Sequence, residues 1–182
     1  MRRIPRNSRV VVAMSGGVDS SVTAAMLVDA GYQVIGMMLR LWSEPGSEIY
    51  NRCCTPDSMA LAREIAGKLN IPIYAVDAKD VFREKVVTYF VDGYQDGVTP
   101  NPCLVCNRTI RWEFLLNRAK ALGAEYMATG HYARLAVVQE GNIELYRAAD
   151  TGKDQSYVLH VLDQARLQHA LFPLGDYTKD QV

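Results

Sequence analysis

Hydrophobic and polar positions along the chain follow two alternating patterns. Short apolar runs that are rich in β-branched residues and bounded by turn residues predict buried strands. They cover residues 10–14, 33–39, 72–77 and 126–129. The segments between them repeat apolar residues at helical spacing and end at residues that stop helices, so they predict helices. These cover residues 19–30, 56–69, 80–94 and 108–122.

Strands that alternate with helices predict an α/β fold, a parallel sheet with helices on both faces. Beyond residue 130 the pattern changes, and two short apolar segments, 133–139 and 143–148, flank Glu140-Gly141-Asn142. This arrangement predicts a β-hairpin. Ligands of parallel sheets bind beyond the carboxyl ends of the strands, so the residues that follow each strand are the first candidates for a site.

The length of 182 residues suffices for one well-buried domain and the start of another. We expect a basic tail at residues 1–8, which is either a short disordered segment or an arm that contacts phosphate. One domain is expected to cover residues 9–160. Residues 161–182 are interpreted as the truncated start of a next domain, and the chain as a fragment of a longer protein.

Composition narrows the class of protein without choosing a function. Apolar residues make up 49% and charged residues 22%, as in ordinary globular proteins. No apolar run is long enough to span a membrane and no secretory signal opens the chain, so a reducing cytoplasm is the expected compartment. The formal net charge is zero, which gives no support to a nucleic-acid partner. Four cysteines form two close pairs, which in a reducing compartment indicate catalysis or metal binding more often than a disulfide.

The strongest local signal is the loop Ser15-Gly16-Gly17-Val18-Asp19-Ser20-Ser21, which follows the first strand and opens the first helix. Paired glycines let backbone N–H groups approach a ligand closely, and a helix N-terminus favours an anion. The serine hydroxyls add donors for phosphate oxygens. Asp19 repels a bare phosphate and is expected either to cap the helix or to bind Mg²⁺. A tight strand-to-helix turn without a ligand is the alternative.

This loop resembles the pyrophosphatase loop, or PP-loop, of the N-type ATP pyrophosphatases, which have an adenine nucleotide α-hydrolase-like fold. The resemblance implies that ATP is cleaved to AMP and pyrophosphate while an oxygen of a substrate is adenylated. Members of this group act on different substrates, so the loop alone does not choose among them. The ATP-binding residues that it implies are Ala13, Met14, Ser15, Gly16, Gly17, Val18, Asp19, Ser20 and Ser21, with Mg²⁺ at Asp19.

A second signal is the stretch Thr99-Pro100-Asn101-Pro102-Cys103-Leu104-Val105-Cys106-Asn107. Its prolines predict a stiff loop, with Asn107 capping the helix that follows. Cys106 is then expected at a helix N-terminus, where the thiolate is stabilised, with Arg108 and Arg111 nearby. Three interpretations stay open for Cys103 and Cys106: half of a zinc site, inert packed cysteines, and sulfur or iron–sulfur chemistry.

The cysteine stretch is similar to the Asn-Pro-Asp-x-x-Cys-Asn loop of bacterial tRNA-specific 2-thiouridylases. In that family the motif cysteine is a catalytic nucleophile, which falls on Cys106. The Asn-Pro-Asp part contacts the target base, and it falls on Asn101, Pro102 and Cys103, so this chain has a cysteine where the familiar pattern has an acid. Related tRNA thiolases hold a [4Fe-4S] cluster with three cysteines. Cys103 and Cys106 are candidates for two such ligands, with the third from Cys53, Cys54 or sequence beyond residue 182.

Three further stretches match the same family. Leu39, after the second strand, falls on the adenine contact; Gly130, after the fourth, falls on an ATP contact, and His131 on a residue that faces tRNA. Read alone, these positions are typical of ordinary strand packing and of a hydrogen-bonded structural histidine. The polar stretch 152–157 contains residues that fall on a tRNA-contacting segment, namely Lys153, Asp154 and Gln155.

The resemblance covers nearly the whole chain and implies a tRNA-uridine 2-sulfurtransferase, which thiolates the wobble uridine of tRNA at C2. ATP adenylates the C2 oxygen, and sulfur from a cysteine persulfide or a cluster-bound sulfide then displaces AMP. The implied partners are tRNA and a sulfur-donor protein or sulfide source, without a membrane, and residues 161–182 are expected to open a tRNA-binding domain. The alternatives are another N-type ATP pyrophosphatase that acts on a small molecule and a non-catalytic nucleotide-binding module.

Overall fold

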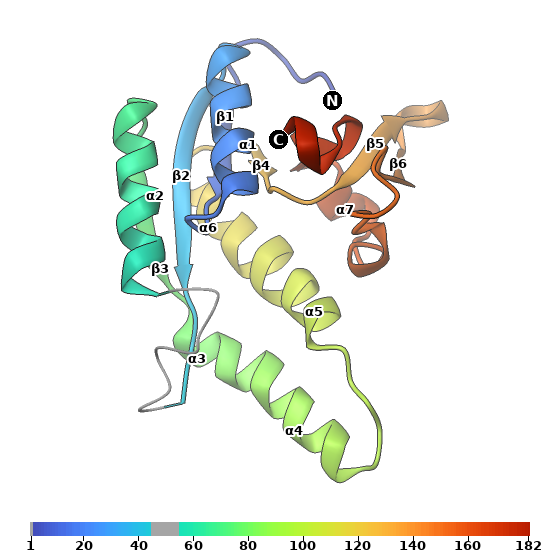
Figure 1. Ribbon diagram of the computed structural model, residues 1–182. Coiled ribbons are helices and arrows are strands. Elements are labelled where there is room, and N and C mark those ends of the chain that lie inside the picture. Colours follow the sequence, from blue (N-terminus) through green and yellow to red (C-terminus); the bar gives the residue numbers. More distant parts are fainter. Residues whose placement is uncertain (1, 45–54) are drawn as a thin grey trace.

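Figure 1 shows the computed structural model, which describes residues 2–44 and 55–182. Its central feature is a five-stranded sheet in the order β3-β2-β1-β4-β7, in which every pairing is parallel. The strands are β1 (Arg9–Ala13), β2 (Gln33–Arg40), β3 (Ile73–Asp77), β4 (Tyr126–Ala128) and β7 (Ala170–Leu171). With helices on both faces, this sheet confirms the predicted α/β fold.

One face of the sheet is covered by α1 (Val18–Asp29) and α2 (Pro56–Lys68). The chain forms α2 where it does because Thr55 caps the helix: its side chain accepts a hydrogen bond from the backbone N–H of Ser58, and Pro56 occupies the first turn. Both helices were predicted, with ends within a residue of those observed.

Two further helical segments lie toward the other face: the first starts at the carboxyl end of β3 and extends beyond the sheet, and the second returns from there and packs its C-terminal end on that face (Figure 1). The first combines α3 (Lys79–Phe82), a π-helical stretch (Arg83–Val87) and α4 (Thr88–Gln95). The second combines α5 (Pro102–Val105), a longer π-helical stretch (Cys106–Leu115) and α6 (Leu116–Ala121).

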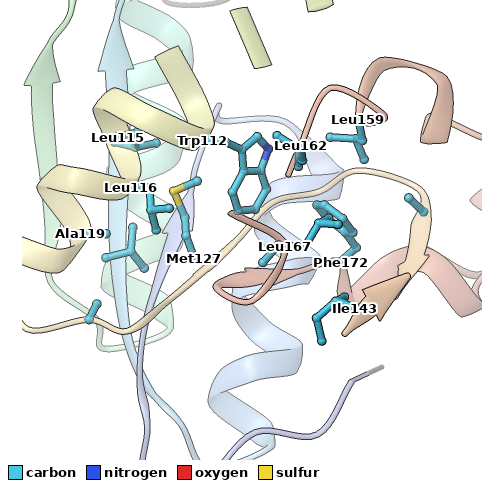
Figure 2. Close-up of a cluster of buried hydrophobic side chains, with 14 of the residues drawn as sticks. Trp112, Leu115, Leu116, Ala119, Met127, Ile143, Leu159, Leu162, Leu167 and Phe172 are labelled. Carbon is cyan, nitrogen blue, oxygen red and sulfur yellow. The ribbon is translucent and has the colours of Figure 1, made fainter. Parts of the chain in front are cut away.

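The side chains of β1 divide the interior into two cores because successive residues of a strand point to opposite faces. Val10 and Val12 pack into the core beneath α1 and α2. Val11 points to the other face and joins a larger core that includes Trp112 and Phe172 (Figure 2). Their rings meet edge to face, with centroids 5.6 Å apart.

The second helical segment begins six residues before the position that the sequence predicted. Proline was expected to keep residues 99–107 in a loop, but Pro102 occupies the first helical turn, where a missing N–H costs nothing. The side chain of Asn101, not that of Asn107, caps this helix, because its Oδ1 accepts a hydrogen bond from the backbone N–H of Cys103 at 3.0 Å.

The predicted hairpin is confirmed as β5 (Ala133–Val137) and β6 (Ile143–Arg147), which pair antiparallel. The chain then continues through α7 (Gln164–Leu167) into β7, which pairs with β4. Leu162, Leu167 and Phe172 are buried in the same core as Trp112. The predicted boundary at residue 160 therefore does not coincide with a break in packing. Because β7 has only two residues, it leaves no periodic signal in the sequence.

Residues 2–8, expected to be a loose tail or a phosphate-binding arm, lie against the body of the protein. The Arg2 guanidinium donates hydrogen bonds to the carbonyl oxygens of Leu167 and Gln168, and Ile4 packs against the core beneath α1. None of the helices in the described ranges has the length and apolarity that crossing a bilayer requires.

Candidate active site

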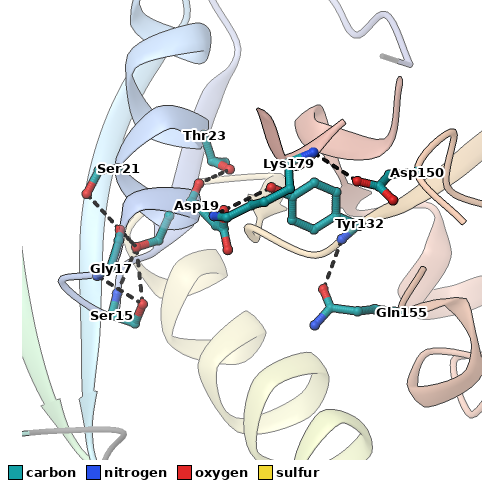
Figure 3. Close-up of polar contacts among 10 residues, drawn as sticks. Ser15, Gly17, Asp19, Ser21, Thr23, Tyr132, Asp150, Gln155 and Lys179 are labelled. Atoms are coloured by element: carbon teal, nitrogen blue, oxygen red, sulfur yellow. Dashed lines mark hydrogen bonds and ion pairs between the residues drawn. The ribbon is translucent and has the colours of Figure 1, made fainter. Parts of the chain in front are cut away.

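The glycine loop connects β1 to α1 and is held in shape by its own serines (Figure 3). The hydroxyl of Ser20 accepts a hydrogen bond from the backbone N–H of Ser15 at 3.1 Å and donates to the carbonyl oxygen of Gly17 at 3.0 Å. The hydroxyl of Ser21 donates to the same carbonyl at 2.9 Å. These hydroxyls make hydrogen bonds within the loop and so fix its conformation. The loop lies at the carboxyl end of β1, the end of a parallel strand where such folds bind ligands.

Asp19 does not cap α1. The N-cap is Gly17, so Asp19 lies in the first helical turn with its side chain directed out of the helix. Its Oδ1 accepts a hydrogen bond from the hydroxyl of Tyr132 at 3.0 Å and pairs with the ammonium of Lys179 at 2.5 Å. Burial and the hydrogen bond to Asp19 raise the pKa of Tyr132, which keeps the phenol protonated as a donor. Binding of Mg²⁺ at Asp19 stays a prediction, and the ion would meet a carboxylate that is paired with an ammonium.

A cavity of about 220 Å³ opens beside the glycine loop, and we call it the loop cavity. Ser15, Asp19 and Ser20 line it from the loop, and Gly130 and His131 line it from the segment after β4. Gly130 must be glycine, because a Cβ there would lie 2.9 Å from the carbonyl carbon of Asp19 and 3.0 Å from the backbone N of Ser20. The two predicted ATP-binding segments therefore meet at one cavity.

A second cavity, of about 290 Å³, lies next to it, and we call it the thiol cavity. Cys106 lines it together with Met14 and Leu39, the latter predicted as an adenine contact. Ala13 and Ser15 line both cavities. Folding thus places the predicted nucleophile beside the predicted nucleotide site, although 91 residues separate Ser15 from Cys106 in the sequence.

The structure changes the electrostatic environment that was predicted for the two cysteines. Cys106 was expected at a helix N-terminus, but it lies in the second turn, after Pro102–Val105. Cys103 is the residue in the first turn, and its side chain is exposed. The helix dipole acts mainly within the first turn, so it favours a thiolate at Cys103 more than at Cys106. Cys53 and Cys54, considered as further ligands, lie outside the described residues.

His131 sits in the loop cavity as a neutral imidazole. Its Nδ1 is 2.7 Å from the hydroxyl of Thr129, and its ring meets that of Phe172 edge to face. Burial, and to a lesser degree the positive charge of Arg111, lowers the pKa of His131 to about 3. A tRNA contact through this residue stays a prediction, in which a neutral ring stacks or hydrogen-bonds.

The lowered pKa of His131 predicts a loss of stability in acid. Above its ordinary pKa of 6.5 the histidine is neutral in both the folded and unfolded states. Below that value the unfolded chain takes up the proton and the folded protein does not, so the unfolding free energy falls as the pH falls toward about 3. We expect His131→Asn, which keeps a polar atom near Thr129, to flatten this slope by up to about 1.4 kcal/mol per pH unit. Urea unfolding at pH 7, 6 and 5 measures it, and equal slopes in both proteins would contradict the assignment.

The predicted tRNA-contacting stretch is divided in its roles. The carboxylate of Asp154 accepts hydrogen bonds from the backbone N–H of Ala148 and the hydroxyl of Ser156, each at 2.8 Å, so it is used within the fold. Gln155 accepts a hydrogen bond from the backbone N–H of Tyr132 at 3.0 Å and lines the loop cavity. Lys153 is exposed. Asp154 and Gln155 are both partly buried, so Lys153 is the exposed residue of the three.

Several residues in or beside the two cavities were not singled out as site residues from the sequence. Tyr132 and Lys179 meet Asp19, and Arg111 lines both cavities. The position of Tyr132 directly after His131 was a usable signal. Lys179 left none, because it reaches Asp19 across 160 residues of sequence.

A family model described as the tRNA methyl transferase HUP domain matches residues 8–182. The chain belongs to this family. Several curated proteins that are similar to this chain are named tRNA-specific 2-thiouridylase MnmA. One from Sorangium cellulosum is 51% identical over 176 residues, which cover 96% of this chain and 46% of that protein. One from Chloroflexus aggregans is 48% identical, covering 96% of this chain and 49% of that protein.

The chain therefore spans about half the length of the curated relatives that it matches. Among solved structures, a predicted subunit of tRNA methyltransferase from Methanocaldococcus jannaschii has a TM-score of 0.53 at 18% identity, covering 95% of this chain and 71% of that one. At this identity the likeness shows the fold alone. It agrees with the parallel sheet described above.

Proposed function

We propose that this chain is the ATP-binding and catalytic part of an enzyme that thiolates the wobble uridine of tRNA at C2. The observation that carries the proposal is the meeting of the glycine loop and Cys106 at adjoining cavities that share Ala13 and Ser15. A thiol next to a phosphate-binding loop suits a reaction in which a nucleotide activates an oxygen and sulfur then replaces it. The names of the relatives support tRNA as the substrate.

In the first stage the phosphates of ATP lie at Ser15, Gly16 and Gly17, where the loop N–H groups and the N-terminus of α1 favour negative charge. The C2 oxygen of the uridine attacks the α-phosphorus; an oxygen–phosphorus bond forms and the bond to pyrophosphate breaks. Backbone dipoles that are already oriented stabilise the charge of the leaving group. Met14 and Leu39 offer apolar surface for the adenine at the thiol cavity.

In the second stage a sulfur nucleophile attacks C2 of the adenylated uridine, and AMP leaves with the former C2 oxygen. Cys106 is proposed to carry the persulfide whose outer sulfur attacks C2, since it lines the cavity next to the loop. A second thiol of the full-length protein then attacks Cys106; the S–S bond breaks, the sulfur stays on C2, and the two cysteines are left as a disulfide. The target base must leave its stack to reach this cavity, and Asn101, Pro102 and Cys103 lie at the start of the same helix. The exposed Lys153 is proposed to contact tRNA phosphate.

Two metal groups were predicted, and the residues fit them differently. Mg²⁺ needs one or two carboxylates besides the phosphates, and Asp19 supplies one; the ion would neutralise phosphate charge there. For a [4Fe-4S] cluster, no three metal-binding side chains come together within residues 2–44 and 55–182. Cys103 and Cys106 supply two cysteines, and a third must come from outside these ranges. No step above depends on a cluster.

The test is product analysis with ATP labelled at the α-phosphate, using the full-length protein with and without tRNA that carries a wobble uridine. The proposal expects AMP and pyrophosphate with that tRNA, and much less with the same tRNA carrying cytidine at the wobble position. AMP formation with a small molecule and without tRNA would favour another ATP pyrophosphatase. Binding of ATP without release of pyrophosphate under any condition would favour a non-catalytic nucleotide-binding module.

A further inference from the structure

Arg111 occupies a position between the two cavities that no motif of the sequence explains. It lines the loop cavity with Asp19 and His131, and it also lines the thiol cavity with Cys106. Three residues line both cavities: Ala13, Ser15 and Arg111. Of these three, Arg111 carries a charge. The positive charge of Arg111 acts on the loop cavity: it helps to lower the pKa of His131, which lines that cavity.

The helix geometry explains how Arg111 comes to share a cavity with Cys106. The two residues are five apart, and in an α-helix they would point about 140° away from each other. The stretch Cys106–Leu115 is π-helical, and the carbonyl oxygen of Arg111 accepts a hydrogen bond from the N–H of Leu116, five residues on. A helix that closes such bonds turns less per residue, which brings residues five apart toward the same face.

Asn107 fixes the guanidinium in this position. It is only 1% exposed, and its side chain connects two parts of the protein. Its Nδ2 donates to the carbonyl oxygen of Val158 at 3.2 Å, and its Oδ1 accepts a hydrogen bond from Nη1 of Arg111 at 3.0 Å. A buried amide with both ends bonded has one orientation, so its Oδ1 holds Nη1 of Arg111 in a fixed place.

We infer that Arg111 couples the two stages of the reaction: its guanidinium binds the α-phosphate of ATP and of the adenylated uridine on one side, and stabilises the Cys106 thiolate on the other. Asn107 is its positioning residue. The inference rests on the proposed function for the phosphate and on the thiol cavity for the thiolate. Guanidinium suits this role because it stays charged and offers several donors in one plane. An anion that grows at the α-phosphorus during adenylation is stabilised by such a preorganised cation.

The first experiment compares Arg111→Gln with Arg108→Gln in the full-length protein. Both changes remove one positive charge from the same helix, but Arg108 is exposed and lines neither cavity. We expect Arg111→Gln to lower kcat for tRNA-dependent AMP formation by about 100-fold or more. Arg108→Gln should stay within about threefold of wild type, as an exposed change outside both cavities does. Arg111→Lys should recover part of the loss, since it restores the charge without the fork of donors.

The second readout needs neither ATP nor tRNA. Iodoacetamide reacts with the thiolate of Cys106, and peptide mass spectrometry follows that residue alone. Loss of a nearby cation should slow this reaction about 10-fold at pH 7 in Arg111→Gln, and not in Arg108→Gln. Equal alkylation rates in the three proteins would overturn the thiolate half of the inference.

The role of Asn107 is tested by a double-mutant cycle. Asn107→Ala should lower AMP formation about 10- to 100-fold, the value of a lost charge-assisted hydrogen bond. If Asn107 acts through Arg111, the same change should cost little in an Arg111→Gln background. A full additive loss would assign Asn107 a structural role and overturn its positioning role.

The outcomes separate the inference from the proposed function. If wild type forms AMP with tRNA and Arg111→Gln does so at a similar rate, the phosphate half of the inference fails and the function stands. If wild type forms no AMP with tRNA, the proposed function fails, and the phosphate half of the inference fails because it depends on that function. The alkylation result then decides the thiolate half by itself.

Discussion

Replacing Cys106 with serine is expected to abolish thiolation of tRNA while tRNA-dependent AMP formation continues within about threefold of wild type. Serine has the same shape but is far less nucleophilic, so it removes the second stage and leaves the first. Cys106 lines the thiol cavity, not the loop cavity, so the phosphate contacts should survive. Thiolated uridine is measured by mass spectrometry of digested tRNA and AMP by thin-layer chromatography. Loss of both products in a folded protein would contradict the division into two stages.

Cys103→Asp decides between the two sulfur chemistries. Cys103 is exposed in the first turn of its helix, where a carboxylate is favoured by the helix dipole, so the variant should fold. If Cys106 works through a persulfide, Cys103→Asp should thiolate tRNA within about 10-fold of wild type, because it only restores the familiar family pattern. If the pair binds a cluster, this variant should lose the iron and the activity together, since the cluster loses a thiolate ligand. Iron content after anaerobic purification is measured with the activity.

Gly16→Ala is expected to lower the unfolding free energy by about 2–4 kcal/mol and to abolish ATP binding. Gly16 has a φ of +76°, which strains any residue with a Cβ. A Cβ there would also lie 2.2 Å from the carbonyl oxygen of Ser58, in the first turn of α2. The loop or the helix must therefore move, and either movement changes the backbone that is proposed to hold the phosphates.

Gly17→Ala is the matched control for this change. Its φ of −89° is normal for alanine, and the nearest atom to a new Cβ is the hydroxyl oxygen of Ser15 at 3.5 Å. We expect a change in stability within about 1 kcal/mol, because the new Cβ meets no close contact, and a much smaller loss of ATP affinity than in Gly16→Ala, because the loop keeps its shape. Chemical unfolding and calorimetric titration with ATP measure both variants. If Gly16→Ala bound ATP as Gly17→Ala does, the loop would not be the phosphate site.

The order of strands and helices followed from the sequence because its signals are local. Apolar periodicity marked β1 to β4, and stop residues marked the ends of α1 and α2. The predicted start of the helix that carries Cys103 and Cys106 was wrong, and the reason is also local. Pro102 was interpreted as a helix breaker, although proline is favourable at the first helical position. Asn101, two residues before Cys103, carried the capping signal that was assigned to Asn107.

For the candidate site, the sequence by itself predicted which segments to consider. The glycine loop, Gly130 and Cys106 each carry a pattern that local chemistry makes recognisable, and the carboxyl-end rule predicts where the first two lie. Tertiary structure alone decided how their side chains meet. Lys179 reaches Asp19 because β7 pairs with β4 and carries the following residues back to α1. Arg111 lies between the two cavities because a π-helical stretch turns it there and the buried Asn107 holds it. Such contacts depend on packing between distant segments, and neither periodicity nor capping encodes that packing within one stretch of sequence.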